Sequence, residues 1–192
     1  MVHDGISPLM DGRTMARLRF RAASKFLAPL AALIKQGLAP AKKKGATPMG
    51  KAMSHMLTSC FVGKFPRLEI DPSKIKLSEG NLANPLEMEA FRRGDTITVS
   101  WSTEVLNNFN AHHDDLIIAC AYGITARSAV LQKGDVLRKE GRAVVILPDD
   151  LMAETVHLYL LAHTRDKKRF SRNMYLGEFT ANKGIMASNP KK

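Results

Sequence analysis

The chain has 192 residues, of which 45% are hydrophobic and 24% are charged, as is usual for a folded globular protein. A chain of this length buries a hydrophobic core without disulfides or metal ions to stabilise it. Two cysteines are too few for the disulfide framework of a small secreted protein, and no apolar run approaches the roughly 20 residues of a membrane span. We expect Cys60 and Cys120 to be buried free thiols.

The net charge of +11 is concentrated near the N-terminus. Residues 1–67 hold 12 Lys and Arg against 2 Asp and Glu, whereas residues 68–192 hold 17 against 16. This asymmetry favours contact with nucleic acid, an acidic partner or a membrane surface. A cationic helical face that is simply solvated explains the same counts, so both interpretations stay open.

The first predicted element is a helix over about residues 13–36. Its apolar side chains recur at steps of three and four residues, which indicates one buried stripe. Pro29 interrupts the segment, so we expect it to kink the helix or to begin a second one that ends at Gly37. The stripe consists of Met15, Leu18, Ala22, Phe26, Leu30 and Leu33.

A further helix is predicted over about residues 47–61. Thr47 is a favourable N-cap, and Pro48 suits the first helical turn. A basic linker precedes this helix. We therefore assign residues 1–66 to a basic helical region. The linker cations are Lys42, Lys43 and Lys44.

Beyond Phe65 apolar and polar side chains alternate, which is typical of half-buried strands. Eight or nine short strands separated by turns predict an antiparallel sandwich. A parallel sheet is disfavoured, because each of its crossovers needs about a dozen residues or more. The predicted fold class is α+β: basic N-terminal helices, then an immunoglobulin- or fibronectin-like β-sandwich over residues 67–181 and a loose tail over 182–192.

Three strings in the sequence are similar to those of an uncharacterised Bacteroidetes family, catalogued as a domain of unknown function. The first is DPSKIKLSEGNLANP at residues 71–85. The second begins with Leu147 and Pro148 and continues with TVHLYL at 155–160, Asp166, Lys167, Ser171 and YLG at 175–177. The third is FLAPL at 26–30, in a segment that ends at Gly37. The resemblance implies a helical N-terminal part and a C-terminal β domain. It supplies no catalytic residue, substrate or cofactor.

Clustered cations are the main candidates for binding. If the turn near residue 168 lies on the same side as the first helix, the two form one positive patch that contacts phosphates without reading base sequence. Aromatic residues make up only 6% of the chain, which favours backbone contact over base stacking. The candidate residues for nucleic acid or an acidic partner are Arg13, Arg17, Arg21, Lys25, Lys42, Lys43, Lys44, Lys167, Lys168 and Arg169.

One polar cluster contains side chains that suit zinc or another transition metal. Neighbouring residues seldom converge on one ion without a ligand from elsewhere, so we favour a polar loop between strands and predict no metal and no cofactor. The cluster consists of His112, His113, Asp114 and Asp115, and the distant histidines that could add a ligand are His157 and His163.

No nucleophile elbow, phosphate-cradling glycine loop, metalloprotease helix or paired-cysteine zinc pattern appears. We therefore expect a non-enzymatic interaction or structural module that binds a protein partner, or a second copy of itself, through basic helices and sandwich loops. The alternatives are a nucleic-acid-binding protein and, less favoured, a metal-dependent hydrolase built around His112, His113 and Asp114. Residues 1–10 show no signal peptide, which favours the cytoplasm or a phage or other particle.

Overall fold

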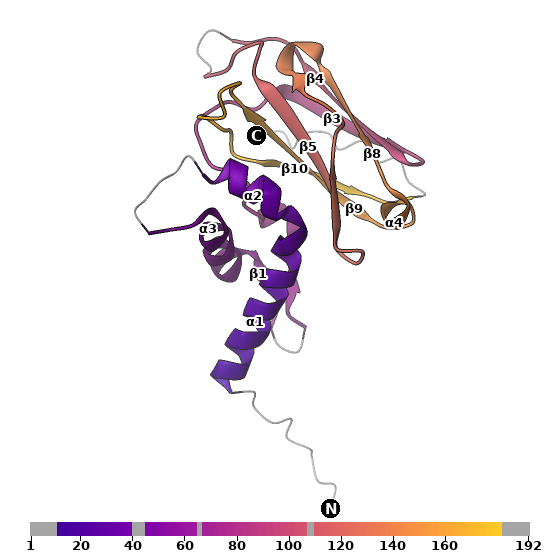
Figure 1. The fold of residues 1–192 in the computed structure, drawn as a ribbon. Helices are drawn as coiled ribbons and strands as arrows, with labels where there is room; N and C mark the ends of the chain where they lie inside the picture. The colour runs from indigo at the N-terminus through magenta and orange to yellow at the C-terminus, as the bar shows by residue number, and fades with distance from the viewer. Residues whose placement is uncertain (1–10, 40–44, 65–66, 107–109, 182–192) are drawn as a thin grey trace, which may run out of the picture.

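The computed structural model describes residues 11–39, 45–64, 67–106 and 110–181. A helical layer covers one face of an antiparallel sheet, and a second antiparallel sheet covers the other face (Figure 1). The predicted α+β class, with an N-terminal helical region followed by an antiparallel β region, is confirmed. Among the described residues no helix combines the length and the apolar character needed to cross a membrane.

The helical layer follows the predicted signals closely. Pro29 lies in the first turn of a 3-10 segment, where its missing N–H needs no partner, and this segment redirects the chain between two helices. The Thr47 side chain caps the next helix by accepting a hydrogen bond from the Gly50 N–H at 3.0 Å. The elements are α1 (Gly12–Leu27), η1 (Ala28–Leu30), α2 (Ala31–Gly37), α3 (Pro48–His55) and the π-helical turn η2 (Met56–Cys60).

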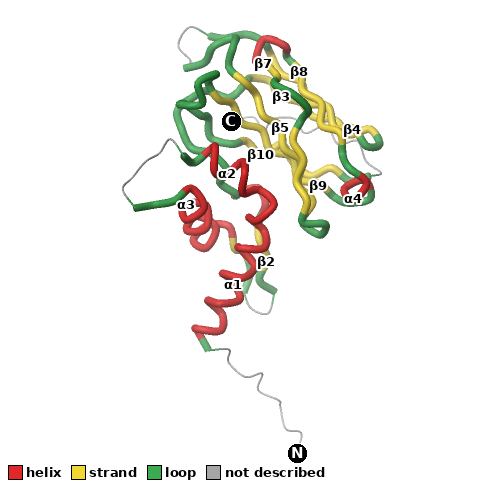
Figure 2. Tube along the Cα trace, viewed as in Figure 1, coloured by secondary structure: helices red, strands yellow, loops and turns green. Residues whose placement is uncertain are grey.

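The strands of the described residues, yellow in Figure 2, form three antiparallel sheets. The central sheet has the order β10-β9-β5-β6, with β7 also paired to β5, and the outer sheet has the order β3-β4-β8. A small third sheet joins β1 to β2. The strands are β1 (Phe61–Val62), β2 (Glu69–Ile70), β3 (Leu86–Arg93), β4 (Thr96–Ser102), β5 (Leu116–Gly123), β6 (Ser128–Leu131), β7 (Val136–Leu137), β8 (Arg142–Ile146), β9 (Val156–His163) and β10 (Met174–Phe179). The short helices η3 (Pro72–Lys74), η4 (Arg138–Glu140) and α4 (Asp149–Met152) lie in the connections.

The central sheet is buried on both faces. Every residue of β5 and β9 is buried, and successive side chains point to opposite sides of the sheet. Ile117 and Ala119 of β5 belong to the hydrophobic cluster shared with the outer sheet. Ile118 and Cys120 belong to a second cluster, shared with the helices. The helices are thus packed on the β region.

Tyr122 fastens α1 to the central sheet. Its hydroxyl donates to the Phe26 carbonyl at 3.0 Å, and the two rings meet edge to face with their centroids 4.9 Å apart. The buried residues of α1 are Ala23, Phe26 and Leu27, all in its last two turns. The N-terminal half of α1 therefore extends beyond the sheet (Figure 1).

Two local expectations were wrong. Leu18, expected in the buried stripe, is 41% exposed, because the part of α1 that carries it lies beyond the sheet. Residues 75–78 alternate like a strand, but they form an irregular segment whose backbone bonds to the Asn173 side chain instead of a neighbouring strand. The domain limits near residue 66 and at 181 stay predictions, and the expected tail at 182–192 lies outside the described residues.

We expect Gly37→Ala to lower the free energy of unfolding by about 1–3 kcal/mol. A Cβ at this position would overlap the Leu77 carbonyl oxygen and the Ser78 side chain, and backbone cannot move aside cheaply. Gly12→Ala is the matched control, because a Cβ on that glycine has no neighbour within 4 Å. Urea denaturation of the two variants measures the difference, and equal stabilities would contradict this account of the contact between α2 and residues 77–78.

Candidate functional site

The first candidate site is the outer side of α1. Residues four apart share a helix face, so Arg13, Arg17, Arg21 and Lys25 follow one exposed stripe, which we call the cationic stripe. The ion pairs among the described residues all lie elsewhere. α1 itself contains no Asp or Glu. The stripe therefore presents positive charge that the described part of the fold does not neutralise.

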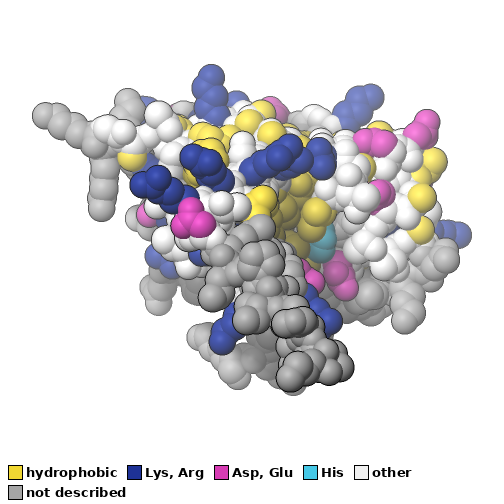
Figure 3. Space-filling view, turned by 90° about the horizontal axis from the view of Figure 1, so that it is seen from below, with side chains coloured by type: hydrophobic (Ala, Val, Ile, Leu, Met, Phe, Trp, Pro, Cys, Tyr) yellow, Lys and Arg dark blue, Asp and Glu magenta, His cyan; other side chains and the backbone are white. Residues whose placement is uncertain are grey.

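Apolar side chains border the cationic stripe. Leu18 is 41% exposed and Phe20 is 55% exposed. With 100° of rotation per residue, these two side chains lie on opposite borders of the stripe. Figure 3 shows Lys and Arg side chains spread over the lower face of the molecule, with hydrophobic side chains between them. A partner that docks on α1 would meet apolar as well as charged groups.

Arg19 is turned inward and differs from the other α1 arginines. Its guanidinium donates to the Leu57 carbonyl at 2.7 Å and lies 4.8 Å from the centre of the Phe61 ring. These contacts join α1 to η2 and β1, so Arg19 has a structural role within the helical layer.

The predicted cations of the turn between β9 and β10 lie beside α2, away from the N-terminal half of α1 (Figure 1). Lys167 lines a hollow together with Lys35 of α2. Lys168 forms an ion pair with Asp166 at 3.6 Å, and Arg169 donates to the Asn110 side chain at 2.9 Å. The structure thus does not join this turn to the cationic stripe.

The outcome for the predicted binding residues is mixed. The four residues of the cationic stripe share one surface, the three residues of the turn share another, and Lys42, Lys43 and Lys44 lie outside the described residues. Each surface also contains one cation that the sequence analysis did not name. Lys35 lies beside Lys167, and Arg127 lies beside Lys25. No sequence signal marked them, because only the packing of distant segments brings them there. Binding by any of these residues stays a prediction.

The predicted metal cluster is divided between solvent and core. His112, His113 and Asp114 are exposed, whereas Asp115 is buried and forms an ion pair with buried Arg138 at 3.3 Å. The Asp115 carboxylate also accepts a hydrogen bond from the His112 N–H at 2.7 Å. The negative charge of Asp115 therefore balances the positive charge of Arg138 in the core.

The two distant histidines also have other partners. His157 bonds to the Tyr175 hydroxyl at 2.9 Å, and burial lowers the pKa of His157. His163 bonds to the Thr164 carbonyl at 2.8 Å and stacks on Phe170. In the described part of the chain no group of three or more His, Cys, Asp or Glu is arranged to hold a metal ion.

The two cysteines are buried and free, as expected. Burial raises the pKa of Cys60 to about 11, with a smaller contribution from the negative charge of Asp71. Burial also raises the pKa of Cys120 to about 12. Both side chains are therefore neutral thiols near pH 7, which is the unreactive form.

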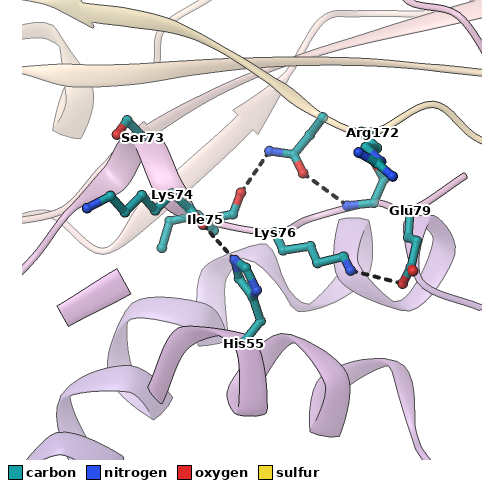
Figure 4. A pocket seen from close by; sticks show the side chains of 9 residues that line it. His55, Ser73, Lys74, Ile75, Lys76, Glu79 and Arg172 are labelled. Atoms are coloured by element: carbon teal, nitrogen blue, oxygen red, sulfur yellow. Dashed lines mark hydrogen bonds and ion pairs between the residues drawn. The ribbon is translucent and has the colours of Figure 1, made fainter. Parts of the chain in front are cut away.

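A second candidate site is a hollow of about 290 Å³, which we call the residue-172 hollow. It lies between α3, η3 with the segment that follows, and the chain leading into β10 (Figure 4). Lys76 forms an ion pair with Glu79 at 3.1 Å, and the His55 ring bonds to the Lys74 carbonyl at 2.9 Å. The lining residues are His55, Ser73, Lys74, Ile75, Lys76, Ser78, Glu79, Arg172 and Asn173.

A family model described as a family of unknown function, DUF6266, matches residues 3–177. The chain belongs to this family. The resemblance to an uncharacterised family is thereby confirmed, while its Bacteroidetes origin stays a prediction. No curated protein and no solved structure matches the chain.

The DUF6266 match includes the cationic stripe and all three segments that build the residue-172 hollow. The string at residues 71–85 meets the chain between Ser171 and Tyr175 of the second string at that hollow. The sequence alone did not predict this hollow, because its opposite walls come from residues almost 100 positions apart.

Asp115→Asn is expected to lower the free energy of unfolding by about 3 kcal/mol, because it leaves the buried Arg138 guanidinium without a counter-charge. The neighbouring Asp114→Asn is the control, since Asp114 is exposed and a surface change of this kind stays within about 0.5 kcal/mol. Thermal and urea unfolding would measure both. Similar stabilities of the two variants would contradict a stabilising role for the buried ion pair between Asp115 and Arg138.

A thiol reagent such as Ellman's reagent is expected to leave the native protein unmodified at pH 8, because both thiols are buried and their pKa values lie above the ordinary range. The same reagent should titrate two thiols per chain in denaturant. Rapid modification of the native protein would contradict the buried placement of Cys60 and Cys120.

Proposed function

We propose that this protein is a non-enzymatic interaction or structural module that holds an acidic partner against the cationic stripe of α1. One observation carries the proposal: four cations stand on an exposed helix face, and no carboxylate of the described residues pairs with them. The sequence also has no Asp or Glu between Asp11 and Glu69, so the helical layer contributes no acid of its own.

The energetics favour a partner with many negative charges. A single exposed ion pair contributes only about 0.2–1 kcal/mol, so useful affinity needs several pairs together. The stripe offers such a series along one helix face, and Leu18 and Phe20 add apolar contact beside it. Because exposed charges are screened by ions, this contact should weaken as salt concentration rises.

We propose further that the β region is an immunoglobulin- or fibronectin-like sandwich. The strand order supports this assignment. If β3, β4, β5, β6, β8, β9 and β10 are taken as strands A, B, C, C′, E, F and G, then A-B-E faces C′-C-F-G. Such a framework would hold the helical layer on one face and leave the loops at its ends free to contact partners, although the fold alone does not define function.

A second candidate partner is nucleic acid, contacted through its phosphates. The observation that favours it is that α1 carries no Asp or Glu after its N-cap Asp11, because carboxylates along the stripe would repel a phosphate backbone. A cytoplasmic location, or a place in a phage or other particle, is compatible with either partner. We do not extend the proposal to a metal-dependent hydrolase, since the candidate ligands of the described chain are separated.

The double variant Arg17→Glu/Arg21→Glu is expected to weaken binding of a fluorescein-labelled poly-glutamate peptide about tenfold or more, as reversal of two contacts removes roughly 1.4 kcal/mol or more. Fluorescence anisotropy at low salt would measure the affinity. Lys133→Glu/Lys139→Glu is the matched control, because it makes the same charge change at exposed residues outside the helical layer. Equal losses of peptide affinity in the two double variants, or no peptide binding by the wild type, would overturn the proposal.

Random-sequence duplex DNA is the second probe in the same assay. Phosphate contact predicts a steep linear fall of log affinity with log salt, and a shallower slope for Arg17→Glu/Arg21→Glu. Duplex binding with this behaviour would favour nucleic acid as the partner. Peptide binding without duplex binding would exclude it.

A further inference from the structure

We propose that the residue-172 hollow binds a small ligand through a phosphate or carboxylate group. This site lies apart from the cationic stripe of α1 and is independent of the function proposed above. The argument rests on the charge around the hollow, an unpartnered buried hydroxyl in its wall, and the rigid backbone that shapes it.

Positive charge exceeds negative charge at the hollow. Lys74 is paired with Asp71 at 3.2 Å, and its ammonium points away from the other lining side chains (Figure 4). Glu79 is the only acidic side chain among the described lining residues, and Lys76 already pairs with it. Arg172 is exposed and forms no ion pair and no side-chain hydrogen bond with the described residues. Its nearest acid at the hollow, Glu79, is already paired with Lys76.

The Glu79 carboxylate lies among these positive charges. Its pKa is lowered mainly by the hydrogen bond from Lys76, and the charges of Lys76, Lys51 and Arg172 lower it further. Several cations thus act on one carboxylate. A cationic ligand would be repelled at this place, whereas an anion would balance the charge of Arg172.

Ser78 is a second, independent sign of a ligand. The residue lines the hollow and is only 1% exposed, and its hydroxyl has no hydrogen-bond partner among the described residues. A buried hydroxyl without a partner costs about 1–3 kcal/mol, which proteins normally avoid. A bound oxyanion would accept a hydrogen bond from this hydroxyl and remove the cost.

Asn173 makes the hollow rigid. Its side-chain oxygen accepts hydrogen bonds from the Leu77 N–H at 2.8 Å and the Ser78 N–H at 3.3 Å, and its amide donates to the Ile75 carbonyl at 2.9 Å. These bonds link the chain that leads into β10 to the opposite wall of the hollow. A site held in place before binding loses less entropy when a ligand is captured.

The size of the hollow limits the ligand. Its volume of about 290 Å³ is at the small end of ligand pockets. A phosphate group, or a short molecule ending in a carboxylate, matches this volume. Arginine suits both, because its planar guanidinium donates two parallel hydrogen bonds to either group.

Isothermal titration calorimetry with inorganic phosphate and, separately, acetate at constant ionic strength tests the proposal. We expect one binding site per chain, with a dissociation constant near the millimolar range for the better probe. Arg172→Gln should weaken binding about tenfold or more, since it removes a charge-assisted hydrogen bond. The matched control Arg142→Gln changes an exposed arginine of β8 and should bind as the wild type does.

Ser78→Ala separates a binding role from a structural one. Removal of an unpartnered buried hydroxyl should leave the ligand-free protein equally stable or more stable, while phosphate or acetate binding becomes weaker. Preference for one probe over the other identifies the group recognised. Absence of binding by both probes, wild-type affinity in Arg172→Gln, or unchanged affinity in Ser78→Ala would overturn the proposal, whatever the result for the cationic stripe.

Discussion

Burial of the central sheet on both faces is the constraint on which the rest of the structure depends. Alternate side chains of β5 and β9 enter two different hydrophobic clusters, one shared with the outer sheet and one with the helices. A shift of one residue in register would exchange these two sets, placing the large Tyr122 and Tyr159 against the outer sheet. The same packing directs α1 past the edge of the sheet and brings residues 73–79 against the start of β10.

Local signals predicted most of the elements, and tertiary contacts decided the rest. The caps and the period of three to four residues marked the helices, while the alternation beyond Phe65 marked the strand region. Leu18 was misplaced because periodicity identifies an apolar face without showing how far the neighbouring layer reaches. Residues 75–78 were misplaced because alternation cannot reveal that Asn173, distant in the sequence, satisfies their backbone groups.

The candidate sites were predictable to different degrees. A spacing of four residues was enough to place Arg17 and Arg21 on one exposed face. The same pattern could not distinguish Arg19, whose contacts with Leu57 and Phe61 come from a later turn of the chain. The residue-172 hollow had no local signature, since its cations and its unpartnered serine come from separate segments that only the folded chain unites.

Because acidic residues are concentrated outside the helical layer, the molecule has a permanent electric dipole moment. Nearly all of its excess positive charge belongs to residues 1–67, and the described helices of this segment pack on a single face of the sheet. An anionic surface would therefore exert a torque on the freely tumbling protein and turn the helices toward itself before any atoms touch. Mobile ions limit the reach of that alignment to about 8–10 Å under physiological conditions. The fold thus selects an approach orientation as well as a place of contact.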